Sequence, residues 1–277
     1  MDVPPVLYKY RSWGCQHSKD ALRSRTIRFT NPLEFNDPFD GRLPNDYRNL
    51  PVDEMVARVL ADEQFFDRVQ ADLRSQGVTI SNDQIVKMMR DEDVIEITRT
   101  RNNGNFDEQL AIERNSTIGI FPVTPVNDSV LMWSHYADSH KGFCIGYSMP
   151  GLIDEFDRLE AEESTFISHF RVRYVPDLPV LDVTDHSDPN WLWRQFITKA
   201  DYWSYETEHR FLLPGKTNTL ITLPPQVITE IVFGALMTIP HQEEIRSLLR
   251  EAGVTPRYYA AKMSKGRYRL NIIAFDQ

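Results

Sequence analysis

Alternation of apolar and polar positions predicts short strands in the first part of the chain. Residues 6–11 follow two prolines and are apolar and aromatic, while residues 26–30 alternate in the manner of a strand. Between them, Ser18 is a candidate N-cap for a short helix. Residues 31–41 carry two prolines, two asparagines and a glycine, so they predict a loop.

The next stretch changes to a helical period. Apolar side chains in residues 52–73 recur on one helical face, and residues 81–101 carry a second apolar stripe of this kind. No Gly/Ser/Pro-rich linker isolates these segments. Residues 52–103 are therefore predicted to be a helical insertion or cap within a single domain that spans residues 1–277, and to border a ligand cleft.

Strand character returns in the second half of the chain, mixed irregularly with helices. Because strands and helices do not alternate, a doubly wound parallel sheet is disfavoured, and the pattern predicts an α+β fold with a mixed or antiparallel central sheet. Gly253 is well placed to end the last helix. The strands are expected at residues 117–122, 142–148, 166–175, 208–213, 229–233, 257–261 and 268–274, and the helices at 150–162, 191–200 and 240–252.

Composition and charge narrow the class of protein. The 277 residues have a formal net charge of −9, which argues against a general nucleic-acid-binding surface. No apolar run reaches the length of a membrane span, and the N-terminus lacks the features of a signal peptide. Cys15 and Cys144 fit no metal or redox spacing, so reduced thiols in a cytoplasmic protein are expected.

Several familiar catalytic motifs do not occur in the chain. It has no GxxxxGK[ST] phosphate loop, no GxGxxG turn after a strand, no HExxH, no CxxC and no GxSxG. Among the seven histidines, His135 and His140 are five residues apart, which is not the spacing of a helix-face pair. Metal catalysis is therefore a poor first hypothesis, and no metal site is predicted.

The densest charged pattern is Glu206, Glu208 and Arg210. If residues 205–210 form a strand, these three side chains share one face. Such a row either faces water as an ion-pair ladder of little energetic value, or builds a site in which Arg210 orients a carboxylate. Lys9 or Arg11 could complete that arrangement. The sequence leaves both interpretations open.

Two other segments carry candidate ligand contacts. Trp133 is expected in the core, whereas His135 and Tyr136 suit equally a core corner or a pocket that stacks a flat ligand. Asn36 and Asp37 precede a proline, which favours a rigid turn; the functional alternative is a loop that shapes the floor of a pocket.

Four motifs in sequence order resemble one bacterial family, domain of unknown function 2971. Over nearly the whole chain the motifs are LYKY at residues 7–10, FTNP at 29–32 with FNDPFD at 35–40, MWSHYA at 132–137 with KGF at 141–143, and WSYETEHR at 203–210. At position 209 the chain has His where this family more often has Trp. The family name implies no activity.

The layout also resembles, more weakly, the ADP-ribosyltransferase fold, which implies NAD as a substrate rather than a permanently bound cofactor. The resemblance implies that Tyr8, Lys9 or Tyr10 lies by the nicotinamide ribose and that Tyr136 or His135 contacts the nicotinamide. Glu206 or Glu208 would hold a ribose hydroxyl and stabilise an oxocarbenium-like transition state. Glu208 is preferred because it adjoins the apolar run 211–213. Lys9 departs from the His or Arg usual at the opening position.

Three functions from different classes therefore stay open. The first is an enzyme that cleaves NAD at the nicotinamide–ribose bond, either an ADP-ribosyltransferase with an unknown macromolecular acceptor or an NAD glycohydrolase, acting as a bacterial toxin or defence effector. The second is a non-catalytic module that senses a nucleotide. The third is a hydrolase in which Glu206 and Glu208 act as an acid–base pair, although two carboxylates on one strand cannot straddle a substrate.

Overall fold

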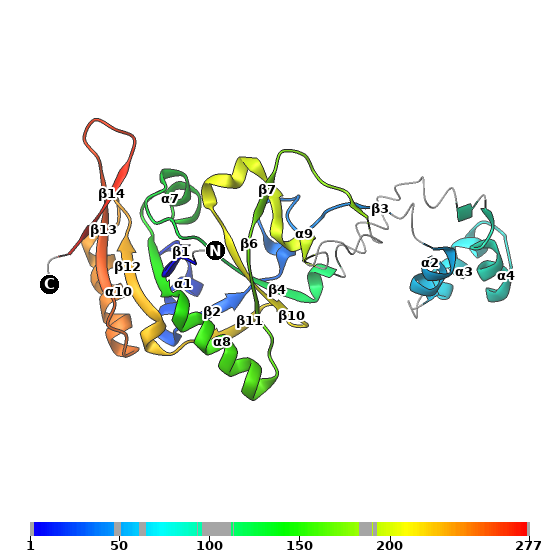
Figure 1. The fold of residues 1–277 in the computed structure, drawn as a ribbon, viewed down its shortest axis with the longest axis horizontal. Helices are drawn as coiled ribbons and strands as arrows, with labels where there is room; N and C mark the ends of the chain where they lie inside the picture. Colours follow the sequence, from blue (N-terminus) through cyan, green and yellow to red (C-terminus); the bar gives the residue numbers. More distant parts are fainter. Residues whose placement is uncertain are drawn as a thin grey trace. The chain divides into compact units, whose positions relative to one another are not determined.

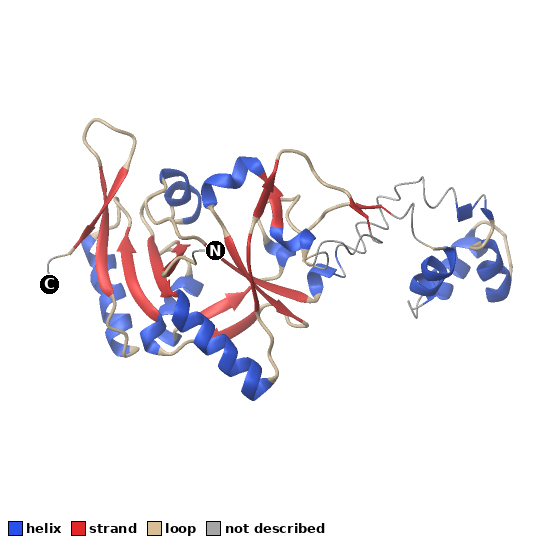
Figure 2. Cartoon of the chain, in the orientation of Figure 1, coloured by secondary structure: helices blue, strands red, loops and turns tan. Residues whose placement is uncertain are grey.

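The computed structural model describes residues 3–46, 51–60, 65–92, 94–95, 112, 114–182, 190 and 193–275. The chain divides into two compact units. Unit 1 comprises Met1–Gly41, Ile112–Asp177 and Gln195–Gln277, and unit 2 comprises Arg42–Ala111 and Leu178–Arg194. Figures 1 and 2 show the elements of both units. Every residue predicted to form the site belongs to unit 1.

Unit 1 is built around a mixed five-stranded sheet. The strand order is β1-β5-β12-β13-β14, and all neighbours are antiparallel except β12 and β13, which are parallel. This mixture confirms the α+β class predicted from the irregular order of strands and helices. The strands are β1 (Val6–Arg11), β5 (Phe143–Ser148), β12 (Ile228–Phe233), β13 (Arg257–Met263) and β14 (Leu270–Ala274).

A second, antiparallel sheet of three strands places β10 (His209–Pro214) between β4 (Ile118–Val123) and β6 (Ser168–Arg171). An isolated bridge between Tyr8 and Thr124 connects β1 to the end of β4. Two strand pairs complete unit 1, namely β2 (Thr26–Phe29) with β11 (Thr219–Thr222), and β7 (Arg173–Val175) with β9 (Thr198–Ala200).

Helices of unit 1 begin and end at recognisable signals. The Ser148 hydroxyl accepts from the Gly151 N–H at the start of α8, and Gly253 follows the last helix with φ of 73°, as predicted for an end cap. The helices are α1 (Gln16–Ser24), α7 (Val130–Tyr136), α8 (Met149–Glu163), α9 (Arg194–Ile197) and α10 (Ile239–Glu251), with 3-10 turns η1 (Pro32–Glu34), η2 (Asp201–Glu206) and η3 (Pro225–Val227).

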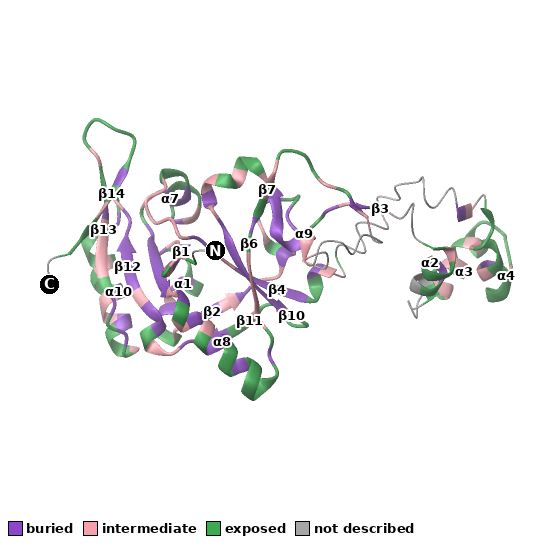
Figure 3. Ribbon diagram, in the orientation of Figure 1, coloured by how far each residue is buried: buried purple, intermediate pink, exposed green. Residues whose placement is uncertain are grey.

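The strands β5 and β12 of the five-stranded sheet are buried on both faces, and they are drawn mostly purple in Figure 3. Along β1, Leu7 joins the main core with α8 and β10, while Tyr8 and Tyr10 join a second core with α7. This separation follows from the two-residue period of a strand. It also places Lys9 on the face of β1 that is opposite to the two tyrosines.

The described residues of unit 2 include the helices α2 (Val52–Leu60), α3 (Phe65–Ser75) and α4 (Asn82–Met88). α4 starts with a capping box of Ser81 and Gln84. β3 (Asn45–Asp46) pairs in parallel with β8 (Leu181–Asp182). Within the predicted insertion at residues 52–103, positions 61–64, 93 and 96–103 lie outside the described residues. The role of these helices as a cap at a cleft stays a prediction.

Several local expectations were wrong. α1 begins at Gln16, so Ser18 lies inside the helix and is not its N-cap. Residues 132–136 form a helix that the sequence did not predict. In the helix expected at 191–200, residues 191–192 lie outside the described residues, Arg194–Ile197 is helical, and Thr198–Ala200 instead pairs with β7. Tertiary pairing overrides local propensity in such short segments.

Candidate functional site

The three charged residues singled out in the sequence do meet, but they do not share one strand. Glu206 ends the 3-10 turn η2, Thr207 is left-handed with φ of 47°, and β10 begins at His209. The left-handed residue breaks the two-residue period, so the predicted strand at 205–210 was wrong for its first half. Shared ion-pair partners, rather than strand geometry, bring the carboxylates together.

Arg210 is the centre of the site. It lies on β10, the middle strand of the three-stranded sheet, and its side chain is 1% exposed. Its guanidinium donates to Asp40 through two bonds of 2.7 and 2.6 Å and to Glu208 through two bonds of 2.8 and 3.2 Å. A further bond of 2.7 Å goes to the Phe196 carbonyl. These bonds engage all three guanidinium nitrogens, as burial of a charge requires.

Lys199 links the two glutamates. Its ammonium group donates to Glu206 Oε2 at 2.7 Å and to Glu208 Oε2 at 3.4 Å. Lys199 is buried, and its Nζ lies 4.7 Å from the centroid of the Trp203 ring. We call Asp40, Lys199, Glu206, Glu208 and Arg210 the buried charge cluster.

Tyr136 closes one side of the cluster. Its hydroxyl, at the end of α7, donates to Glu206 Oε1 at 2.6 Å. The exposed Asn36 side chain also interacts with this hydroxyl. Burial and the neighbouring Glu206 charge both raise the pKa of Tyr136, so the phenol stays protonated and acts as a donor.

The environments of the two glutamates push their pKa values apart. Burial raises the pKa of Glu206, and repulsion by Glu208 adds to this effect against the attraction of Lys199. For Glu208, burial is outweighed by Arg210 and Lys199, which lower its pKa to about 2. Glu208 is thus a permanent anion, whereas Glu206 is the carboxylate whose protonation is easier. Such a separation is typical of acid–base sites.

Lys9 approaches the cluster from β1. Its Nζ donates to the Pro122 carbonyl at 2.8 Å. Burial and the charge of Arg11 lower its pKa to about 7, although the carboxylates of Glu208 and Glu206 oppose this shift. The cluster holds three carboxylates and two cations, so a charged Lys9 or a protonated Glu206 balances its charge.

Tyr8 and Tyr10, predicted beside Lys9, do not join the cluster. The Tyr8 hydroxyl donates to Glu230 at 2.6 Å, and the Tyr10 hydroxyl donates to the Val126 carbonyl at 3.0 Å. Both lie on the opposite face of β1, because successive residues of a strand point to opposite sides. Of the three alternatives Tyr8, Lys9 and Tyr10, it is Lys9 that approaches the cluster.

The turn at residues 36–38 contributes to the cluster indirectly. Asp37 is buried and accepts from the Phe39 N–H at 2.9 Å, which is the turn geometry expected of this residue type. Asp37 forms its hydrogen bond within its own turn, whereas Asp40, three residues later, pairs with Arg210. Asp40 was not recognised as a site residue in the sequence. Its only signal was its place at the end of the FNDPFD motif.

An aromatic group borders the cluster on the outside. His135 is exposed, and its ring centroid lies 6.2 Å from Tyr136, 6.5 Å from Trp203 and 6.3 Å from Tyr205. Trp203 and Tyr205 are half-buried and lie in η2, shortly before Glu206. These four rings form a partly exposed surface beside the Glu206–Tyr136 hydrogen bond, and we call them the aromatic border. His135 thus lies next to the cluster without entering it.

Lys199, like Asp40, was missed in the sequence analysis. It lay in a segment expected to be helical, and no spacing linked it to the glutamates. Among the described residues, no group of three or more His, Cys, Asp or Glu side chains is arranged to hold a metal ion. Within the same ranges, no helix is both long and apolar enough to cross a membrane.

Comparison with known families places the cluster in context. Residues 132–211 match the model of the family described as Protein of unknown function (DUF2971). Over this segment the chain is similar to that family. The match confirms the main resemblance seen in the sequence, and it contains Tyr136, Lys199, Glu206, Glu208 and Arg210. No curated protein and no solved structure matches the chain.

Proposed function

We propose that the protein binds NAD at the aromatic border and cleaves its nicotinamide–ribose bond, with Glu206 as the carboxylate nearest the reacting carbon. The observation that carries this proposal is the position of Glu206, held between the Tyr136 hydroxyl and the Lys199 ammonium at 2.6 and 2.7 Å. The sequence favoured Glu208 for this role. Glu208 is instead bound by Arg210 on two sides and supports the geometry of the cluster.

The chemistry requires stabilisation of a positive charge. When the bond between the ribose C1′ and the nicotinamide nitrogen breaks, its electron pair leaves with nicotinamide and the ribose becomes oxocarbenium-like. A fixed carboxylate in a site of low dielectric stabilises that charge more than it does in water. Water, or a nucleophile on a macromolecular acceptor, then bonds to C1′ and releases one proton.

The aromatic border fits the flat part of the ligand. Tyr136, His135, Trp203 and Tyr205 present partly exposed rings with polar edges, a surface on which a nicotinamide ring can stack. Asn36, whose side chain is exposed, supplies an amide for a ribose hydroxyl or the carboxamide. The proposal includes a cytoplasmic location, which fits the two free cysteines, and a role in bacterial defence.

A non-catalytic nucleotide-binding module is the second candidate, and one observation favours it. Both oxygens of Glu206 accept hydrogen bonds from protein donors. A carboxylate engaged in this way binds a ribose hydroxyl only by sharing or exchanging a donor. The hydrolase ranks third: both glutamates bind the same ammonium group, so they cannot flank a substrate as paired glycosidase carboxylates do.

The test measures nicotinamide release from NAD by the full chain, with and without a cell lysate as acceptor. Glu206→Gln keeps the shape but removes the charge, so turnover should fall by about a hundredfold or more. The exposed Glu160→Gln on α8 is the matched control and should keep full activity. Binding of NAD without release would support the module, and wild-type protein that neither binds nor consumes NAD would reject the proposal.

A further inference from the structure

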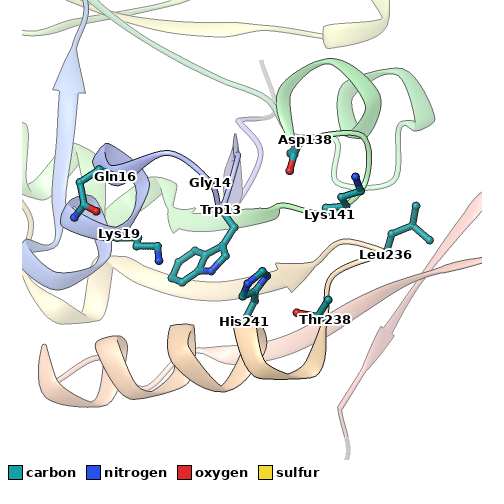
Figure 4. A pocket seen from close by; sticks show the side chains of 9 residues that line it. All are labelled: Trp13, Gly14, Gln16, Lys19, Asp138, Lys141, Leu236, Thr238 and His241. Atoms are coloured by element: carbon teal, nitrogen blue, oxygen red, sulfur yellow. The ribbon is translucent and has the colours of Figure 1, made fainter.

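A cavity of about 340 Å³ lies apart from the buried charge cluster. It is bordered by the start of α1, the start of α10 and the loop that follows α7 (Figure 4). None of the cluster residues and none of the aromatic border lines it. We infer that this cavity binds a phosphate group, either as free phosphate or as part of a small phosphorylated molecule.

The first observation concerns Trp13, which lines the cavity and is 4% exposed. Its indole N–H is buried and has no hydrogen-bond acceptor among the described residues. A buried donor without an acceptor is unfavourable and calls for an explanation. In Figure 4 the nitrogen-bearing side of the indole faces His241, on the side of the cavity formed by α10. An oxyanion there would accept this hydrogen bond.

Two helix N-termini provide further donors. α1 has nine residues and α10 has thirteen, and both begin at this cavity. The N-cap residues are Cys15 and Thr238, and neither makes a side-chain cap hydrogen bond. First-turn N–H groups have no acceptor within a helix, and the helix dipole places partial positive charge at this end. A phosphate group is the kind of ligand that such termini bind.

Two lysines add charge from opposite sides of the cavity (Figure 4). Lys19 lies with its Nζ 4.5 Å from the centroid of a Trp13 ring and is paired with Glu244 at 3.1 Å. The Lys141 side chain is exposed, and within the described part of the chain it makes no hydrogen bond or ion pair. Lys141 is therefore the cation that is available to a ligand.

Asp138 is the only carboxylate among the lining residues, so its replacement should change the affinity for an anion in a predictable direction. Its charge opposes an anion, so replacing it with the neutral isostere should tighten binding. Asp138 has a φ of 48°, and asparagine tolerates this left-handed conformation well. Asp138→Asn therefore changes the charge without adding backbone strain.

The alternative is that Trp13 serves packing alone. It contacts Phe143 edge-on, with ring centroids 5.8 Å apart, and both side chains belong to the main core. Packing alone predicts that the indole N–H does not respond to phosphate and that charges around the cavity do not matter.

The experiment is a ¹H–¹⁵N NMR titration of the full chain with inorganic phosphate at constant ionic strength. Trp13→Phe assigns the Trp13 indole signal, which should move as a hydrogen bond to oxygen forms. Lys141→Met should weaken binding about tenfold, and Asp138→Asn should strengthen it several-fold, within the usual range for charge-assisted contacts. Lys262→Met, an exposed lysine on β13, is the matched control and should change nothing.

A second arm replaces phosphate with adenosine monophosphate. Tighter binding of the nucleotide identifies a phosphorylated small molecule as the ligand, and equal binding identifies free phosphate; either result supports the site. The inference would be overturned if the Trp13 indole signal did not shift with phosphate, or if sodium chloride shifted it equally. Identical affinities of Lys141→Met and Asp138→Asn for phosphate would also overturn it. The titration contains no NAD, so its failure leaves the proposed function untouched.

Discussion

Asp40 and Arg210 lie 170 positions apart in the sequence and form an ion pair of two parallel hydrogen bonds inside unit 1. Neither side chain is more than 2% exposed. A buried pair of this kind contributes less to stability than its strength suggests, because both ions lose their hydration. Breaking it from one side leaves an uncompensated charge in the interior. The pair is therefore a sensitive point for mutation.

Arg210→Met should lower the free energy of unfolding by about 3–5 kcal/mol, because Asp40 and Glu208 are left buried without their main cation. Urea unfolding followed by circular dichroism measures the change. Arg23→Met, which removes an exposed pair with Asp20, is the control and should change stability by at most about 0.5 kcal/mol. Equal effects of the two substitutions would show that the cluster carries no special stability.

Tyr136→Phe should weaken nicotinamide release while leaving the fold intact. The substitution removes only the hydroxyl that donates to Glu206, so the carboxylate loses one of its two fixed partners. We expect about a tenfold fall in turnover, which corresponds to one hydrogen bond to a charged group. Tyr202→Phe is the control, because Tyr202 lies in the 3-10 turn η2, which ends at Glu206, and is 84% exposed. An unchanged rate in Tyr136→Phe would separate this hydroxyl from the reaction.

Protein stability should fall as the pH drops from about 6.5 to about 4, because of His209. Burial, together with the neighbouring His169 and Arg171, lowers the pKa of His209 to about 4. Its Nδ1 lies 2.9 Å from His169 Nε2. Between these pH values the unfolded chain binds more protons than the folded one, so acid favours unfolding, by about 3 kcal/mol over the full window.

His209→Phe should flatten that part of the stability profile, measured by urea unfolding at a series of pH values. His17→Gln is the control, since His17 is exposed on α1 and should leave the profile unchanged. A profile of His209→Phe with the same slope as the wild type would assign the acid sensitivity to other groups.

Lys9 should make protein stability depend on pH in the alkaline range. As for His209, stability should rise with pH. The pKa of Lys9 is lowered to about 7 by burial, so between pH 7 and 10 the unfolded chain binds more protons and stability rises with pH. The gain from pH 7 to 9 is at most about 2 kcal/mol, given partial exposure. Lys9→Met should remove this rise in urea unfolding, while exposed Lys262→Met should retain it. A retained rise in Lys9→Met would reject the assignment.

Local patterns along the chain were sufficient for the class of fold and for most strands. The apolar and aromatic run at residues 6–11 coincides with β1, and Gly253 follows α10 with a positive φ. Such features depend on neighbours within one turn or one strand. The same applies to the turn at Asp37, whose carboxylate bonds to the backbone two residues on.

Recognition of Glu206, Glu208 and Arg210 as a unit also came from the sequence, although for the wrong geometric reason. Three charges within five positions signalled a cost of burial that had to be compensated. The strand that was expected to align them begins only at His209, after Thr207, whose left-handed backbone no alternation pattern predicts. The density of charged residues correctly indicated that the three residues act together, whereas the strand register expected for residues 205–210 was wrong.

Only the tertiary structure decided which residues compensate those charges. Asp40 lies 170 positions before Arg210, and Lys199 lies in a segment with helical character that becomes β9 by pairing with β7. A buried charge accepts any partner of opposite sign within hydrogen-bonding distance, and that distance depends on how the sheets pack rather than on spacing along the chain. The sequence by itself therefore singled out Glu206, Glu208 and Arg210 without deciding whether they face water. Packing determined that they are buried and that Asp40 and Lys199 neutralise them.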